Sequence, residues 1–262
     1  MYFRAKKSLG QNFLIDQSVL EQITNAAEIE NKEVLEIGPG TGNLTAHILK
    51  KNPKKFYVIE KDDDLSLLLS EKFNKQINII NDDVLNVSTD KISKEKLTVF
   101  GNLPYNISTE ILSQWIVNLG KECWFDSLVL MFQKEVADRI IAPYNTSKYG
   151  RLSILSSWKL NVNKIIDIKP TSFSPRPKID SSLLVFTPRK DFFILKDPKN
   201  LEMITRIFFS QRRKMIKKPF NQIFNNTKLL SEKYNIDLNL RPQNLKPEIY
   251  FKLTNEYENL RS

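Results

Sequence analysis

A glycine-rich loop at residues 35–44 has the residue types that hold a nucleoside. Its text, LEIGPGTGNL, follows a predicted strand and opens a predicted helix. Gly38, Gly40 and Gly42 let the backbone turn tightly and approach a ligand without a clash at Cβ. At the end of the next predicted strand, Glu60 offers a carboxylate that accepts hydrogen bonds from ribose hydroxyls. We therefore expect a nucleoside ligand here, with a tight turn beside a solvated glutamate as the alternative.

An alternation of apolar strands and helices predicts how these residues are positioned. We expect strands at 32–38, 55–60, 77–80, 97–100 and 126–132, and helices at 16–28, 41–51, 63–73, 108–119 and 133–142. Continuous apolar strands that alternate with helices are typical of a parallel sheet covered on both faces. A later apolar run at 181–188 is expected to add one more strand to this sheet.

The pattern changes near residue 190. Residues 200–220 have helical periodicity and a dense basic cluster, and no strand pattern follows them. The sequence therefore predicts an α/β domain at 1–190 and a small all-α domain at 191–262. More than half of the formal net charge of +10 lies in the second segment.

Four predicted strands end at residues that are suited to contact a ligand, namely Gly38, Glu60, Asp83 and Asn102. Ligands of open α/β sheets bind at the carboxyl ends of the strands, so these residues are expected at one edge. Asp82 or Asp83 would accept a hydrogen bond from an adenine amino group. This pattern resembles the class I S-adenosylmethionine-dependent methyltransferases, and the resemblance implies their Rossmann-like sheet and their cofactor.

The segment after the fourth strand, Asn102-Leu103-Pro104-Tyr105, resembles the signature of amino-methyltransferases. The side-chain oxygen of Asn102 and the carbonyl of Leu103 would accept hydrogen bonds from a target amine and localise its lone pair. Pro104 would fix the direction of that carbonyl, and Tyr105 offers a face for a base removed from a helix. Phe173, beside two prolines, is a candidate for the second face, although a core phenylalanine fits the same text.

Blocks along nearly the whole chain resemble the bacterial small-subunit (16S) ribosomal RNA adenine dimethyltransferases, the KsgA family. They are SLGQNFLID (8–16), EIGPGTGNLT (36–45), VFGNLPYNIST (99–109), MFQKEVADRI (131–140), YGRLSIL (149–155), FSPRPKIDSS (173–182) and FFSQRRKMIKK (208–218). The resemblance implies dimethylation of two adjacent adenosines in a hairpin loop near the 3′ end of 16S rRNA, late in small-subunit assembly. It places the target adenine between Tyr105 and Phe173, and makes residues 11–14 a lid over the cofactor. It implies S-adenosylmethionine contacts at Asn12, Leu14, Gly38, Gly40, Glu60, Asp83 and Asn102.

Composition fits a nucleic-acid partner. A sequence pI near 9.4 indicates a polyanionic partner, and no apolar run approaches the ~20 residues of a membrane span. One cysteine and one histidine exclude a disulfide framework and argue against a metal centre. No apolar signal core follows the basic N-terminus, so we expect a cytoplasmic protein, and a monomer.

The basic run in the predicted helix at 200–220 is expected to contact ribosomal phosphate, with a merely solvated helix as the alternative. It consists of Arg212, Arg213, Lys214, Lys217 and Lys218.

Three other functions compete with this interpretation. The antibiotic-resistance dimethyltransferases of large-subunit rRNA share the glycine loop and the Asn-x-Pro-Tyr segment, but GRLS and FSQRRK favour the small-subunit family. An assembly or transcription factor that lost catalysis is disfavoured because Asn102, Tyr105 and Glu60 are intact. A DNA adenine methyltransferase would need a target-recognition insert, for which the sequence has no candidate.

Overall fold

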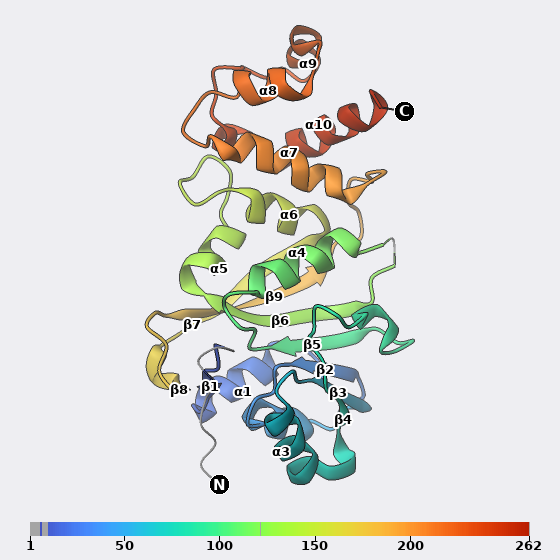
Figure 1. The fold of residues 1–262 in the computed structure, drawn as a ribbon, viewed down its shortest axis with the longest axis vertical. Helices are drawn as coiled ribbons and strands as arrows, with labels where there is room; N and C mark the ends of the chain where they lie inside the picture. The colour runs from blue at the N-terminus through green and yellow to red at the C-terminus, as the bar shows by residue number, and fades with distance from the viewer. Residues whose placement is uncertain (1–5, 7–9, 121, 262) are drawn as a thin grey trace. The chain divides into compact units, whose positions relative to one another are not determined.

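A seven-stranded sheet organises the first part of the chain (Figure 1). The computed structural model describes residues 6, 10–120 and 122–261. The strand order is β4 (Asn78–Ile80), β3 (Lys55–Ile59), β2 (Glu33–Ile37), β5 (Leu97–Gly101), β6 (Phe125–Gln133), β9 (Ser181–Pro188) and β7 (Leu160–Ile168). The first five strands are parallel, and β9 runs antiparallel to β6. The predicted parallel sheet with a late added strand is therefore confirmed.

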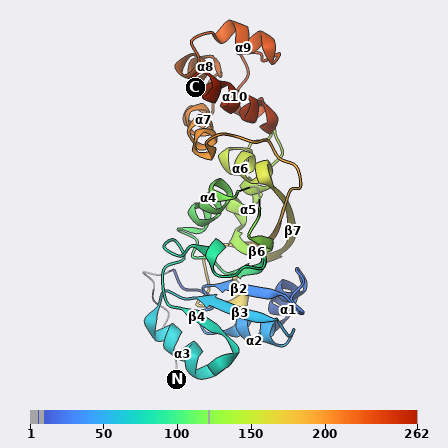
Figure 2. The ribbon, with the colours of Figure 1, turned by 90° about the vertical axis from the view of Figure 1, so that its right-hand side faces the viewer.

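Three helices pack on one face of the parallel strands. They are α1 (Gln17–Asn25), α2 (Asn43–Leu49) and α3 (Asp63–Phe73), and Figure 2 shows α1 beside α2. A single hydrophobic cluster joins Leu20, Ile48 and Leu69 of these helices to Val34 and Val58 of the strands. Because successive strand residues point to opposite faces, the neighbours of Val34 and Val58 are left to face the other layer.

The described residues contain one strand, β7, and one two-stranded sheet that the sequence pattern did not predict. β7 alternates buried and exposed positions, as expected of a strand at the sheet's edge, but its polar residues masked the apolar pattern. β1 (Phe13–Leu14) pairs antiparallel with β8 (Phe173–Ser174), and the two lie side by side in Figure 1. Both are too short to leave a periodic signal.

A second unit contains residues 113–118, 138–161 and 189–262, and its described part beyond residue 189 is helical. Its helices are α6 (Arg151–Lys159), α7 (Pro198–Ser210), α8 (Lys217–Ile223), α9 (Thr227–Lys233) and α10 (Pro247–Asn259). Two further helices are divided between the two units, α4 (Ser108–Asn118) and α5 (Lys134–Ile140). The core of the second unit is aromatic, with the Phe208 and Tyr250 ring centroids 5.5 Å apart at near-perpendicular planes. The predicted all-α character of the C-terminal segment is confirmed.

The prediction of one helix over 200–220 was wrong. α7 ends at Ser210, and α8 begins at Lys217. Where α8 begins, the backbone N–H groups of Ile216 and Lys217 donate to the carbonyls of Leu240 and Leu238. These long-range backbone bonds replace helical ones and interrupt a pattern that is helical in sequence alone.

None of the helices in the described ranges has the length and hydropathy that crossing a membrane requires.

Candidate active site

A cavity of about 230 Å³ opens at the carboxyl ends of β2, β3 and β5. Its walls come from the loops that follow those strands and from the N-terminal residues around β1. The structure brings every cofactor-binding residue expected from the sequence to this one cavity: Asn12, Leu14, Gly38, Gly40, Glu60, Asp83 and Asn102. These seven residues are spread over 91 positions of the chain, and the parallel sheet gathers them at one edge.

The glycine loop is shaped so that Gly40 has no room for a side chain. Its φ is +56°, a left-handed conformation that L-residues rarely adopt. A Cβ placed there would lie 2.7 Å from Cδ1 of Phe13, so the loop and β1 are in close contact. The Gly40 N–H donates to Oε2 of Glu60 at 3.2 Å, which links the loop to the acid of the next strand.

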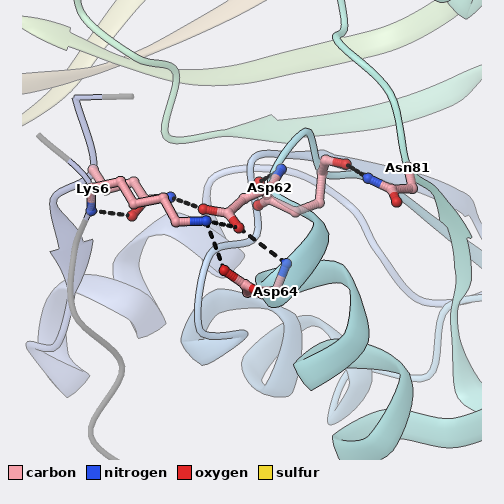
Figure 3. A network of polar contacts seen from close by, with 6 residues as sticks. Lys6, Asp62, Asp64 and Asn81 are labelled. Carbon is pink, nitrogen blue, oxygen red and sulfur yellow. Dashed lines mark hydrogen bonds and ion pairs between the residues drawn. The ribbon is translucent and has the colours of Figure 1, made fainter. Parts of the chain in front are cut away.

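Glu60 is a buried carboxylate that is held at both oxygens. Oε2 accepts from Gly40 N, and Oε1 accepts from the backbone N of Asp62 at 2.9 Å. Asn81 Nδ2 donates to the Glu60 carbonyl at 3.0 Å and anchors the backbone at the same point (Figure 3). Burial raises the pKa of Glu60, and the two backbone donors oppose that shift. Each oxygen still has a lone pair for a ligand hydroxyl.

A polar network ties the N-terminal residues to this acid (Figure 3). Asp62 is only 3 % exposed, and its carboxylate accepts from Lys6 Nζ at 2.7 Å and Gln11 Nε2 at 2.9 Å. Lys6 Nζ also pairs with Asp64 at 2.8 Å. Burial alone would raise the pKa of Asp62, but the hydrogen bonds from Lys6 and Gln11 outweigh it and hold that pKa low. The network fixes Gln11, a wall residue of the cavity, and was not predicted from the sequence.

Asn102 is oriented by the N-terminal segment. Its Nδ2 donates to the backbone carbonyl of Asn12 at 2.9 Å. Because the amide nitrogen is used in this way, Oδ1 is the free acceptor, and no group in the described residues donates to it. Leu103 buries its side chain against Gly101, so only the backbone of that residue is offered to a ligand. Pro104 and Tyr105 also line the cavity.

Glu36 is a second buried acid on the cavity wall, and sequence reasoning did not assign it a role. Thr45 Oγ1 donates to its Oε2 at 2.7 Å. Burial raises the pKa of Glu36 to about 8; the Thr45 hydrogen bond opposes this rise, and the nearby charge of Glu60 adds to it. The position of Glu36, directly before the glycine loop, was the feature of the sequence that could have predicted its place at the cavity.

Asp83 is already engaged in an ion pair. Lys61 Nζ lies 2.7 Å from its Oδ2, and the backbone N of Leu85 donates to Oδ1 at 3.0 Å. The Lys61 hydrogen bond is the largest cause of a lowered Asp83 pKa, so this residue is ionised. It remains an acceptor at the cavity edge.

Phe173 is not on the cavity wall. It is 1 % exposed and packs in the hydrophobic cluster beneath α1 and α2, where β8 pairs it with Leu14. The structure therefore brings Tyr105, but not Phe173, to the surface of the cavity.

The basic residues of the second unit divide into two groups. Arg212 is half-buried and donates to Gln243 Oε1 and to the carbonyls of Thr146 and Ser147, so it ties loops of its own unit together. The remaining side chains of the basic run are exposed: Arg213, Lys214, Lys217 and Lys218.

No group of three or more histidine, cysteine, aspartate or glutamate side chains within the described residues is arranged to hold a metal ion.

Comparisons with known proteins agree on one family. The family model for ribosomal RNA adenine dimethylase matches residues 2–259. A curated protein of Pelagibacter ubique, named ribosomal RNA small subunit methyltransferase A, is 74 % identical over 261 residues and covers 100 % of both chains. A protein of the same name from a Wolbachia strain is 43 % identical, covering 97 % of this chain and 94 % of its own.

Solved structures show the same fold. A dimethyladenosine transferase from Plasmodium falciparum superposes with a TM-score of 0.78 at 26 % identity, covering 94 % of this chain and 98 % of its own. The 23S rRNA methyltransferase ErmE superposes with a TM-score of 0.69 at 22 % identity, covering 96 % and 100 %. The predicted Rossmann-like methyltransferase fold is confirmed, and the chain belongs to the ribosomal RNA adenine dimethylase family.

Proposed function

We propose that this enzyme dimethylates the exocyclic amino groups of two adjacent adenosines in the 3′-terminal hairpin loop of 16S rRNA, late in small-subunit assembly. The orientation of Asn102 is the observation that carries the proposal. Its amide nitrogen is held by the Asn12 carbonyl, which leaves Oδ1 as an acceptor at the cavity for the target amine. The relatives named as small-subunit methyltransferases support the choice of the 16S substrate.

The cavity fits S-adenosylmethionine as the cofactor. Glu36 and Glu60 are buried acids on its wall, and their oxygens can accept hydrogen bonds from the hydroxyl and amino groups of a ligand. Glu60 would accept from the ribose hydroxyls and Asp83 from the adenine amino group, while Gly38 and Gly40 leave room for close approach. When bound, the cofactor supplies an electrophilic methyl group.

The work of the protein is to align the amine and to localise its lone pair. The N–H groups of the target adenine donate to Asn102 Oδ1 and to the Leu103 carbonyl, which draws the nitrogen towards a tetrahedral geometry. Pro104 restricts the backbone next to that carbonyl. The ring of Tyr105 stacks on the base. Phe173 is proposed for its other face, which requires its ring to leave the hydrophobic cluster in which it packs in this structure. Such alignment supplies catalysis without a general base, because the proton of the methylated amine can leave to solvent after the transfer.

We assign methyl transfer and ribosome binding to different predicted domains. Residues 1–190 carry the cofactor and the chemistry, and residues 191–262 contact the ribosome. The exposed cations of the basic run, Arg213, Lys214, Lys217 and Lys218, suit contacts with phosphate, and such contacts make affinity fall with salt. The enzyme is proposed to act as a monomer in the cytoplasm, where small subunits assemble.

A methylation assay with a mapped product tests this function. The purified protein is incubated with methyl-labelled S-adenosylmethionine and, in parallel, with unmethylated small subunits, naked 16S rRNA, large subunits and adenine-rich DNA. We expect dimethyladenosine at two adjacent positions of the small subunit. Label in large-subunit rRNA or DNA would instead identify a rival activity, and subunit binding without any label would identify an accessory protein that lacks catalysis.

A further inference from the structure

The phenol of Tyr105 is anchored to a residue far along the chain. Its hydroxyl lies 2.5 Å from Oγ of Ser181, and the two share a hydrogen bond. Ser181 is 0 % exposed and is the first residue of β9. It pairs with Gln133 at the end of β6, so it belongs to the rigid sheet rather than to a loop.

Tyr105 is therefore held at both ends. Its backbone lies in the turn after β5, where Ile107 N and Ser108 N both donate to the Pro104 carbonyl. Its phenol is fixed at the sheet by Ser181. Burial raises the pKa of the phenol above its usual value, so it stays protonated and the hydrogen bond persists at neutral pH. A ring fixed at two points cannot swing about its side-chain torsions to leave the cavity wall.

We propose that Ser181 is a positioning residue for methyl transfer, because it holds the ring of Tyr105 in place before the adenine arrives. This inference rests on the proposed function, in which that ring stacks on the target base. Ordering a side chain on binding costs free energy, and a ring that is ordered beforehand avoids that cost. The neighbouring Ser182 offers a comparison, since it is equally buried but bonds to Asp167 instead of Tyr105.

A double-mutant cycle on the full-length protein tests the proposal. Ser181→Ala and Tyr105→Phe each remove one partner of the same hydrogen bond and keep the ring. Methyl transfer to unmethylated small subunits is measured for both single variants, for the double variant and for the control Ser182→Ala. We expect each single variant to lower kcat/KM for the subunit about three- to tenfold, the range for one neutral hydrogen bond. The double variant should be no slower than either single variant, while KM for S-adenosylmethionine stays unchanged.

Four outcomes would overturn the inference or the stacking role on which it rests. If the two effects multiply in the double variant, the residues act independently and Ser181 does not work through Tyr105. If Ser182→Ala slows transfer as much as Ser181→Ala, the effect belongs to β9 in general. The variant Tyr105→Ala distinguishes the positioning role of Ser181 from the stacking role of Tyr105. Full activity in that variant would refute the stacking role itself, whereas loss of activity beside a normal Ser181→Ala rate would refute only the role of Ser181.

Discussion

Replacing Glu36 with glutamine should change how the stability of the ligand-free protein depends on pH. The Glu36 carboxyl is buried on strand β2 beside Glu60, and burial raises its pKa from 4.5 to about 8. In the unfolded chain the group ionises near 4.5, so between these two pH values the unfolded state releases a proton that the folded state keeps. The contribution of the Glu36 carboxyl to the free energy of unfolding is thus fully present below pH 4.5 and is lost as the pH rises towards 8.

The size of the effect follows from the shift. Each pKa unit corresponds to about 1.4 kcal/mol, so the shift of Glu36 is worth about 5 kcal/mol between the two ends of the range. Glu36→Gln removes the titration and keeps an acceptor for Thr45 Oγ1. The free energy of unfolding of the variant, relative to that of the wild type, should therefore rise by about 5 kcal/mol between pH 4 and pH 8.5.

Denaturant unfolding of both proteins across that pH range is the assay. Glu33→Gln is a matched control, because Glu33 lies on the same strand but has a lowered pKa. Burial raises that pKa, but hydrogen bonds from Ser93 and Lys55 outweigh it. The stability that the Glu33 carboxylate contributes is present above its unfolded pKa and is lost as the pH falls. Glu33→Gln should therefore be less stable than the wild type at neutral pH. A Glu36→Gln difference that is constant with pH would refute the reasoning.

Three further predictions concern cofactor and RNA. Gly40→Ala imposes about 1–2 kcal/mol of strain on the left-handed backbone, and its Cβ would clash with the ring of Phe13 in β1. Cofactor affinity, measured by calorimetry, should therefore fall at least tenfold. The control Gly120→Ala, where a Cβ meets only a backbone oxygen at 3.9 Å, should bind the cofactor with normal affinity. Equal cofactor affinities of the two variants would contradict the role of the glycine loop. Glu60→Gln turns an amide N–H₂ towards backbone donors and should weaken cofactor binding by about 10- to 100-fold; unaltered binding would remove Glu60 from the site. Neutralising Arg213 and Lys214 should reduce the slope of log affinity against log salt for small subunits by about 0.7 per lost contact, and an unchanged slope would exclude them from the interface.

The ends of the parallel strands were predictable because they depend on a local pattern. Each strand's apolar run can be recognised from its own residues, and parallel pairing then puts every carboxyl end at the same edge. Gly38, Glu60 and Asn102 therefore meet at the cavity as the sequence predicts.

Contacts between distant segments were not predictable in the same way. The bond from Gln11 to Asp62 and the bond from Tyr105 to Ser181 join residues that no periodicity relates. The orientation of Asn102 likewise depends on where the Asn12 carbonyl lies in the folded chain.

The basic run illustrates how tertiary contacts override a helical pattern. Residues 200–220 have helical spacing throughout, yet α7 ends at Ser210, and the N–H groups of Ile216 and Lys217 bond to Leu240 and Leu238 instead of to the preceding turn of a continuous helix. Arg212 is charged like its neighbours but is used within its own unit. Charge and periodicity alone do not distinguish a structural arginine from an exposed one.

The rate of methyl transfer by Asn102→Ala tests the central claim most directly. Transfer to unmethylated small subunits is measured under single-turnover conditions with saturating cofactor, beside the affinity of the variant for the subunit. The account predicts a loss of at least about 100-fold in rate, the scale of removing one positioned transition-state hydrogen bond, with subunit affinity nearly intact. A variant that methylates the two adenosines at the wild-type rate would contradict the role of the Asn102 oxygen and the mechanism built on it.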